Sequence, residues 1–226
     1  MTMRIADRIS NLGTETAFAV GAEAAAWAAQ GNAVYPFHLG DLNLPTPSTV
    51  VEGSFAAIKA GKTGYCPNAG IPELREAIAL NVSASHAVDY TMENVAVQPG
   101  GKPTIGKFIM ALMNPGDEVL YPNPGYPIYE SQIEFHGGTA VPYGYTEGAS
   151  GFELDFDGIE RAITDKTTLF ILNDLQNPMG AELSVAEQAR LAELIREHDL
   201  YLLSDEAYFD IRYAGKSRSI VEEPGM

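Results

Sequence analysis

Basic residues, cysteine and histidine are all scarce in this sequence. Its 226 residues include 14 lysines and arginines against 30 acidic residues, which gives a formal net charge of −16. The basic residues are scattered along the chain, whereas binding the phosphate groups of nucleic acid or of an anionic membrane requires clustered ones. We therefore expect no nucleic acid and no membrane as a partner. Cys66 is the single cysteine, which excludes an internal disulfide and suits a reducing compartment.

Metal ligands and long apolar runs are also lacking. His38, His86, His136 and His198 are dispersed, without ligand-like spacing to one another, so we expect no metal site. The N-terminus has no apolar run of the signal-peptide type. The alanine-rich stretch 14–30 contains two glutamates and is too short and too weakly apolar to span a bilayer, so it predicts a helix on a protein surface. We expect a soluble, cytoplasmic protein.

From residue 94 onward, strand patterns and helix patterns alternate. The expected strands are 95–99, 117–122, 139–143, 167–173 and 200–206, and the expected helices are 101–112, 125–137 and 185–198. This alternation predicts the α/β class, with a mostly parallel sheet flanked by helices. An N-terminal helix and a proline-rich extended arm come first. We expect two parts, 1–47 for the helix and arm and 48–226 for the main domain.

Polar signals fall where the predicted strands end, which is where parallel sheets bind ligands. Gly100 and Gly101 begin a helix, and the free N–H groups of a helix start suit a phosphate, although a plain glycine turn explains them equally well. Asn177-Pro178 follows the strand 167–173, and this bond could be cis, directing the asparagine amide toward a ligand; a simple Asn-Pro turn is the alternative.

Asp205 ends the strand 200–206. Such an acid is commonly a helix cap or a surface charge. A buried carboxylate beside a heteroaromatic nitrogen would instead keep that nitrogen protonated, as the pyridine ring of pyridoxal phosphate requires. Tyr208, three residues further on, could place its hydroxyl near the phenolic oxygen of that ring.

Several ordered motifs carry a resemblance to a known family. They are HLGDLNLPTP, TGYCPNAGIPELREAI, PGGKPT, NPGDEVLYPNPGYPIYES, NPMG and SDEAY, and they extend over almost the whole chain. The sequence resembles the class I/II aminotransferases, which are fold-type-I pyridoxal-phosphate-dependent enzymes. The resemblance implies the cofactor-binding large domain of that fold over 48–226, incomplete at its C-terminal side, with 1–47 contributing to the small domain or the dimer contact.

The resemblance also implies roles for single residues around the cofactor. The backbone at Gly101 and Lys102 would bind the phosphate, and Tyr126 would stack on the pyridine ring. Asn177 and Tyr208 would bind the phenolic oxygen of the ring. Asp205 would pair with the ring nitrogen.

Two further roles concern the substrate and a second subunit. Tyr65 would reach the phosphate of the partner subunit's cofactor in a homodimer, and Gly40 would lie near the substrate carboxylate. The substrates implied are an amino acid and a 2-oxo acid. The family pattern is broken where Leu175 replaces a proline and Met179 replaces a threonine, which affects the turn and the substrate edge of the pocket.

The family's lysine that binds the cofactor covalently has no counterpart here. The six lysines are Lys59, Lys62, Lys102, Lys107, Lys166 and Lys216, and none has the expected serine-rich setting. By the resemblance that lysine lies beyond Met226, so this chain would be an N-terminal portion of an aminotransferase, inactive alone. The alternatives are a non-catalytic binding or assembly module, or a C–S lyase or an aminocyclopropane-carboxylate synthase type of enzyme on the same fold.

Overall fold

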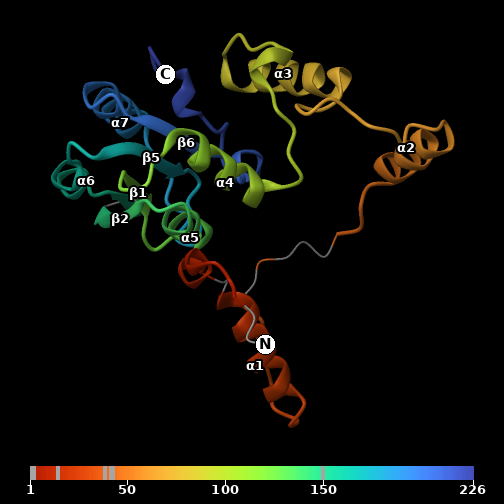
Figure 1. Ribbon diagram of the computed structural model, residues 1–226, viewed down its shortest axis with the longest axis horizontal. Helices are drawn as coiled ribbons and strands as arrows, with labels where there is room; N and C mark the ends of the chain where they lie inside the picture. The colour runs from red at the N-terminus through yellow and green to blue at the C-terminus, as the bar shows by residue number, and fades with distance from the viewer. Residues whose placement is uncertain (1–3, 14–15, 38–39, 41–43, 149–150) are drawn as a thin grey trace.

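The computed structural model describes residues 4–13, 16–37, 40, 44–148 and 151–226, and Figure 1 traces the chain from red to blue. Its α-helices are α1 (Thr16–Ala28), α2 (Ser48–Lys59), α3 (Pro72–His86), α4 (Gly101–Leu112), α5 (Ile128–Phe135), α6 (Phe156–Ala162) and α7 (Val185–Glu197). Its strands are β1 (Glu118–Pro122), β2 (Thr139–Tyr143), β3 (Tyr145–Gly148), β4 (Gly151–Leu154), β5 (Thr167–Asn173) and β6 (Tyr201–Asp205). Its short 3-10 helices are η1 (Asp7–Asn11), η2 (Met92–Asn94), η3 (Phe209–Ile211) and η4 (Ile220–Glu222).

The main sheet has four parallel strands in the order β2-β1-β5-β6. Parallel neighbours need crossover connections, and helices provide them here. Asn173, the last residue of β5, is paired in register with Asp205, the last residue of β6. β3 and β4 form a separate antiparallel hairpin. The prediction of a mostly parallel sheet flanked by helices is confirmed.

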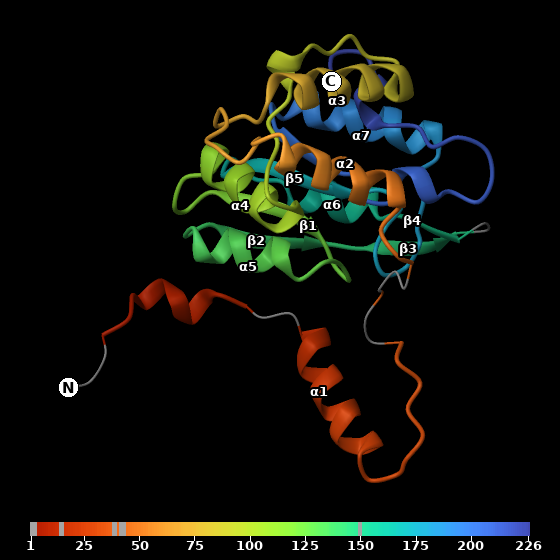
Figure 2. The same ribbon diagram turned by 90° about the vertical axis from the view of Figure 1, so that its right-hand side faces the viewer.

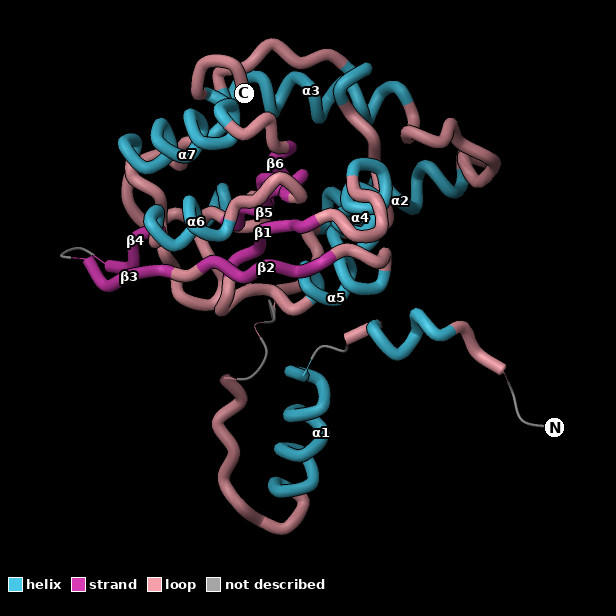
Figure 3. The backbone as a smooth tube through the Cα atoms, turned by 60° about the vertical axis from the view of Figure 1, so that its left-hand side comes forward, coloured by secondary structure: helices cyan, strands magenta, loops and turns pink. Residues whose placement is uncertain are grey.

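Alternating side chains of the buried strands divide the core into two layers. Leu169 and Ile171 of β5 belong to the cluster formed with α4 and α5, whereas Phe170 and Leu172 belong to the cluster with α6 and α7. Successive side chains of a strand point to opposite faces, so a strand covered on both sides is apolar on both, as residues 169–172 of β5 are. Figure 3 shows the strands side by side, with α6 and α7 to their left and α4 and α5 to their right.

Characteristic residues mark the starts of two helices. The Ser184 hydroxyl accepts the Glu187 N–H at 3.2 Å, and the Glu187 carboxylate accepts the Ser184 N–H at 2.8 Å, a reciprocal capping box at the start of α7. Pro72 occupies the first turn of α3, where its missing N–H leaves no helical bond unmade. α3 and α7 therefore begin where these residues place them.

The strand predicted over 95–99 is wrong. The Val95 carbonyl accepts a hydrogen bond from the Arg75 guanidinium at 2.9 Å, and the Val97 N–H donates to the Ala69 carbonyl at 2.8 Å. These partners on α3 and on the loop before it take the place of a strand ladder. The segment lies beside α3, and the main sheet begins with β1 instead.

The N-terminal part has much less packing than the sheet. α1 stands away from the strands in Figures 1 and 2, and none of the residues of α2 is buried. Described residues between 31 and 47 form no helix or strand, in keeping with an extended arm. The domain division at residue 47 stays a prediction. Within the described ranges, no helix is long and apolar enough to cross a membrane.

Candidate active site

The carboxyl ends of β5 and β6 bring an amide and an acid together. Asn173 and Asp205 are paired in register, and the Asn173 side-chain amide donates to the Asp205 carbonyl at 2.9 Å. Asn173 is only 2% exposed, so this contact is part of the core. Asn173 and Asp205 lie two positions after Ile171 and Leu203, respectively, so their side chains are on the same face of the sheet, toward α4 and α5. The site therefore opens on that face of the sheet.

The Asp205 carboxylate is held by two donors. The Tyr129 hydroxyl of α5 donates to Oδ2 at 2.7 Å, and the Ala207 N–H donates to Oδ1 at 3.2 Å. Burial, with the nearby Asp205 charge as the next cause, raises the pKa of Tyr129 far above the ordinary value of a tyrosine. Tyr129 therefore keeps its proton and acts as a fixed donor, which sets the direction in which the carboxylate points.

The loop after β5 is tied to the loop after β1. Asn177 donates its N–H to the Asn173 side-chain oxygen at 2.9 Å, and the Asn177-Pro178 bond is cis. Gln176, 2% exposed, donates from its side chain to the Pro124 carbonyl at 2.6 Å. These contacts join the Asn177 backbone to the strand end that carries Asp205.

Glycines make the start of α4 open and accessible. Gly100 has φ 105°, a conformation that favours glycine, and it lies directly before the first helical residue, Gly101. A side chain added at either glycine would meet no atom within 4 Å. Gly101 and Lys102 are exposed. The first turn of this 12-residue helix therefore leaves N–H groups available to an anion.

Tyr126 and Tyr208 lie near Tyr129, the tyrosine that donates to the Asp205 carboxylate. The rings of Tyr126 and Tyr129 meet edge to face, with centroids 5.7 Å apart. Tyr126 and Tyr208 both lie close enough to Tyr129 to contribute to its raised pKa, after burial and Asp205. Both are half-buried. The structure thus gathers Asp205, Tyr126 and Tyr208 in one place.

Two predicted residues lie outside this group. Tyr65 is fully exposed in the loop between α2 and α3. Gly40 has no atom within 4 Å of an added side chain. Within the described part of the chain, neither residue makes a hydrogen bond to the strand ends, so their roles stay predictions.

Tyr129 and Asn173 were missed by the sequence reasoning, although each had a signal. Tyr129 follows Tyr126 by three residues, a spacing that brings the two rings together at the start of α5. Asn173 is the polar residue that ends the apolar run 169–172 of β5. Both contacts to Asp205 join distant parts of the sequence, so spacing alone did not identify them.

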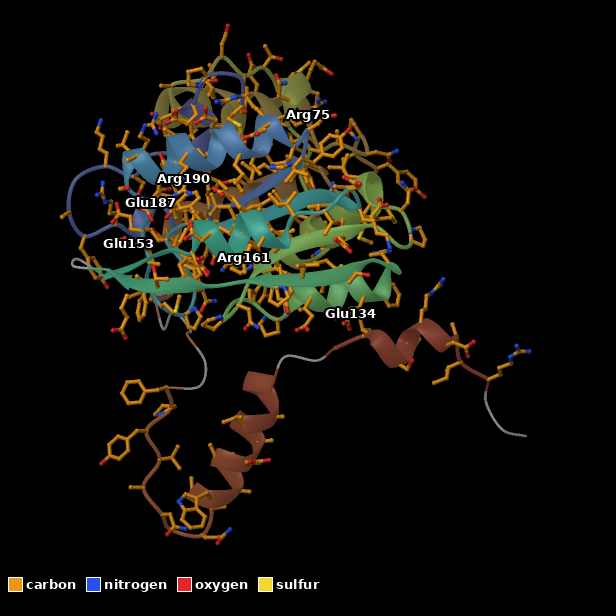
Figure 4. The ribbon with its side chains drawn as sticks, turned by 90° about the vertical axis from the view of Figure 1, so that its left-hand side faces the viewer. Arg75, Glu134, Glu153, Arg161, Glu187 and Arg190 are labelled. Atoms are coloured by element: carbon orange, nitrogen blue, oxygen red, sulfur yellow. The ribbon has the colours of Figure 1, made fainter. Side chains whose placement is uncertain are left out.

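A cavity of about 800 Å³ lies on the opposite face of the sheet, beside α7. Its lining includes Asp174, Glu206 and Arg218, and Figure 4 shows Glu153 and Glu187, which also line it, on the same side of the molecule. Burial raises the pKa of Asp174 to about 6, although hydrogen bonds partly oppose this shift. The cavity is separated by the sheet from the Tyr129 side of Asp205.

No group of three or more histidine, cysteine or acidic side chains in the described residues could hold a metal ion. His38 lies outside those residues, as do residues 41–43 of the first family motif.

The ends of β5 and β6 carry an amide and an acid, and α4, packed on the same face of the sheet, begins with a glycine; groups of this kind suit a phosphorylated small molecule. The family model of class I and II aminotransferases matches residues 35–223, and the chain belongs to this family.

The chain is 34% identical over 208 residues to a probable aspartate/prephenate aminotransferase of Aquifex aeolicus, covering 92% of this chain and 52% of that protein. It is 35% identical over 209 residues to the aspartate/prephenate aminotransferase of Thermus thermophilus, with 92% and 54% covered. An alanine aminotransferase structure from Pyrococcus furiosus superposes with a TM-score of 0.91 at 29% identity, covering 97% of this chain and 56% of that one. The chain thus spans about half the length of the relatives it matches.

Proposed function

We propose that this chain binds pyridoxal phosphate and takes part in the transfer of an amino group between an amino acid and a 2-oxo acid. The observation that carries the proposal is the Asp205 carboxylate, fixed by Tyr129 at the end of β6 on the face that α4 and α5 cover. Membership of the aminotransferase family supports it. Aspartate is the amino donor to assay first, because the Aquifex and Thermus relatives are named for it.

The residues present fit the cofactor. The open first turn of α4 at Gly101 and Lys102 suits its phosphate. Tyr126 offers a half-buried aromatic ring for stacking, and Asn177 and Tyr208 offer polar groups for the phenolic oxygen. Asp205 suits the ring nitrogen, because a carboxylate favours the protonated form of a neighbouring base.

The bound cofactor supplies a pyridine ring that withdraws electrons from the substrate's α-carbon. The chain's own part is to keep the proton on the ring nitrogen, and Asp205 does this with a carboxylate that Tyr129 orients through Oδ2. Asn173 fixes the backbone on both sides, since it bonds the Asp205 carbonyl and the Asn177 N–H. Pre-oriented groups of this kind stabilise charge without reorganising during the reaction.

A lysine is required for the covalent step, and Lys102 is better assigned to the phosphate because it lies in the first turn of α4. We propose that the lysine comes from residues outside this sequence. The intact mass of the natural protein, compared with 24.3 kDa for this chain, tests that assignment.

We further propose a cytoplasmic homodimer in which 1–47 and α2 contribute to the contact. Phe55 and Ile58 of α2 are exposed, as is Tyr65 in the loop that follows. Exposed apolar groups gathered on one segment are typical of interaction surfaces.

The test is an assay of the protein purified from its natural source, with pyridoxal phosphate, aspartate and 2-oxoglutarate. Release of oxaloacetate is expected. Ammonia and a 2-oxo acid released from a C–S amino acid such as cystathionine, without oxaloacetate from aspartate, would favour the lyase alternative and contradict the proposal.

A further inference from the structure

Glu206, the neighbour of Asp205, is the centre of a second polar cluster. Its carboxylate accepts from His86 Nε2 at 2.6 Å and from the hydroxyls of Ser204 and Ser219. The side chains of His86 and Glu206 are 11% and 20% exposed. Two neighbouring acids are thus bound differently: Asp205 by α5, and Glu206 by the end of α3.

Both ring nitrogens of His86 and one face of its ring make contacts. It is the last residue of α3, and Ala87 after it has φ 53°, the left-handed conformation that ends a helix. Nδ1 lies 2.7 Å from the Ser85 hydroxyl, and the ring stacks on Phe209 with centroids 4.2 Å apart and planes 13° apart. His86 therefore contacts two residues of the turn after β6, Glu206 and Phe209.

Glu206 and Phe209 flank Ala207 and Tyr208, two residues on which the proposed cofactor site depends. The Phe209 N–H donates to the Glu206 carbonyl at 3.0 Å, so residues 206–209 form one turn. Tyr208 lies inside this turn, and Ala207 inside it supplies the N–H bonded to Asp205 Oδ1. If the turn shifts, the carboxylate loses a donor and the Tyr208 hydroxyl moves.

We propose that His86 is a positioning residue: through Glu206 and Phe209 it fixes the turn that sets the directions of Asp205 and Tyr208. The proposal rests on the proposed function, since Asp205 and Tyr208 are assigned there to the cofactor. His86 itself would touch neither cofactor nor substrate. Through His86, α3 supports the carboxyl end of β6, although the two elements are distant in sequence.

The experiment compares His86→Leu with His86→Gln, which retains a side-chain donor, and with His198→Leu as the control. His198 is exposed, follows α7, and lies near the opposite end of β6. Two quantities are measured on this chain: amide hydrogen exchange of Ala207 and Phe209, and the dissociation constant of pyridoxal phosphate by equilibrium dialysis.

In His86→Leu, both amides are expected to exchange about tenfold faster, and the dissociation constant to rise about tenfold. His86→Gln is expected to restore most of both losses, and His198→Leu to change neither. Unchanged amide exchange in His86→Leu would overturn the positioning role. Faster exchange with an unchanged dissociation constant would overturn it too, because the turn would then not govern the cofactor.

A parent chain that binds no pyridoxal phosphate would contradict the proposed function instead, and the exchange result alone would then decide whether His86 orders the turn. Circular dichroism shows whether each variant folds. If His86→Leu does not fold, Glu206→Gln replaces it, since this change keeps the side-chain size and removes the charge that His86 contacts, with the same outcomes.

Discussion

Two carboxylates stand close together at the carboxyl ends of β5 and β6, on opposite faces of the sheet. Asp205 lies on the face covered by α4 and α5, where the Tyr129 hydroxyl binds it. Asp174 lies on the other face and lines the cavity beside α7, where it accepts from the Leu183 N–H at 3.1 Å and from Gln188 at 3.3 Å. Burial raises the pKa of Asp174 to about 6.

A cavity and a raised pKa lie on the Asp174 face, whereas the groups that suit the proposed cofactor lie on the Asp205 face. Asp174 has both features, but its donors are a backbone N–H and Gln188, which also supports the Arg218 carbonyl at 2.8 Å. Asp205 lies near groups that can bind a ligand. They are two tyrosine rings, the loop that carries Asn177 and, on the same face of the sheet, the open first turn of α4. The following predictions test this difference.

Removing the Asp205 carboxylate should have the largest effect. Asp205→Ala is expected to raise the dissociation constant of pyridoxal phosphate about 100-fold, because the charged ring nitrogen loses its partner. Equilibrium dialysis measures the constant, and Asp210→Ala, an exposed acid in η3, is the matched control. Equal losses in both variants would show that net charge, and not the position of Asp205, is responsible.

Asp174 should make the unfolding free energy of the chain depend on pH. Because its pKa in the folded protein is about 6, above that of an exposed aspartate, its stabilising contribution is fully present below about pH 4 and is lost as the pH rises through about 6. The parent chain should thereby lose about 2 kcal/mol of unfolding free energy. Asp174→Asn should show a smaller loss between these pH values in urea denaturation. An identical pH profile in both proteins would exclude the buried acid as the cause.

Tyr129→Phe should weaken pyridoxal phosphate binding about tenfold, because the Asp205 carboxylate loses the donor that orients it. The matched control is Tyr143→Phe, which removes a buried hydroxyl that donates to the Ile171 carbonyl at 2.9 Å. Both variants should lose about 1 kcal/mol of stability. If Tyr143→Phe weakened binding equally, general loosening of the core would explain the effect.

The smallest effect is expected at the start of α7. Ser184→Ala removes one half of the capping box and should lower the unfolding free energy by about 1 kcal/mol. The affinity for pyridoxal phosphate should not change, because α7 covers the opposite face of the sheet. Weaker binding in this variant would mean that the two faces are coupled.

The strands of the main sheet were predictable because their patterns are local. β1, β5 and β6 combine apolar runs with turn residues at their ends, and the helix expected over 185–198 is present as α7, which begins with a Ser184–Glu187 capping box. The strand expected at 95–99 was wrong because Arg75 and Ala69 bind its backbone, which is a tertiary effect. The β3–β4 hairpin and α6 are short elements without a strong period, and the sequence patterns did not indicate them.

The candidate site was predicted only at its strand ends. Asn177 follows the buried strand β5 and Asp205 ends β6, and these positions pointed to a ligand. Tyr129 bonds a residue 76 positions away, and His86 bonds one 120 positions away. Such pairs depend on how α3 and α5 pack, and sequence spacing does not report this.

The most direct test of the account is the protonation of the bound ring. The ¹⁵N chemical shift of labelled pyridoxal phosphate, bound to this chain at neutral pH, reports whether its pyridine nitrogen carries a proton. We predict a protonated nitrogen in the parent chain and an unprotonated one in Asp205→Asn, because the amide removes the charge that favours the proton. A bound cofactor with an unprotonated nitrogen in the parent, or a shift that Asp205→Asn leaves unchanged, would contradict the assignment of Asp205.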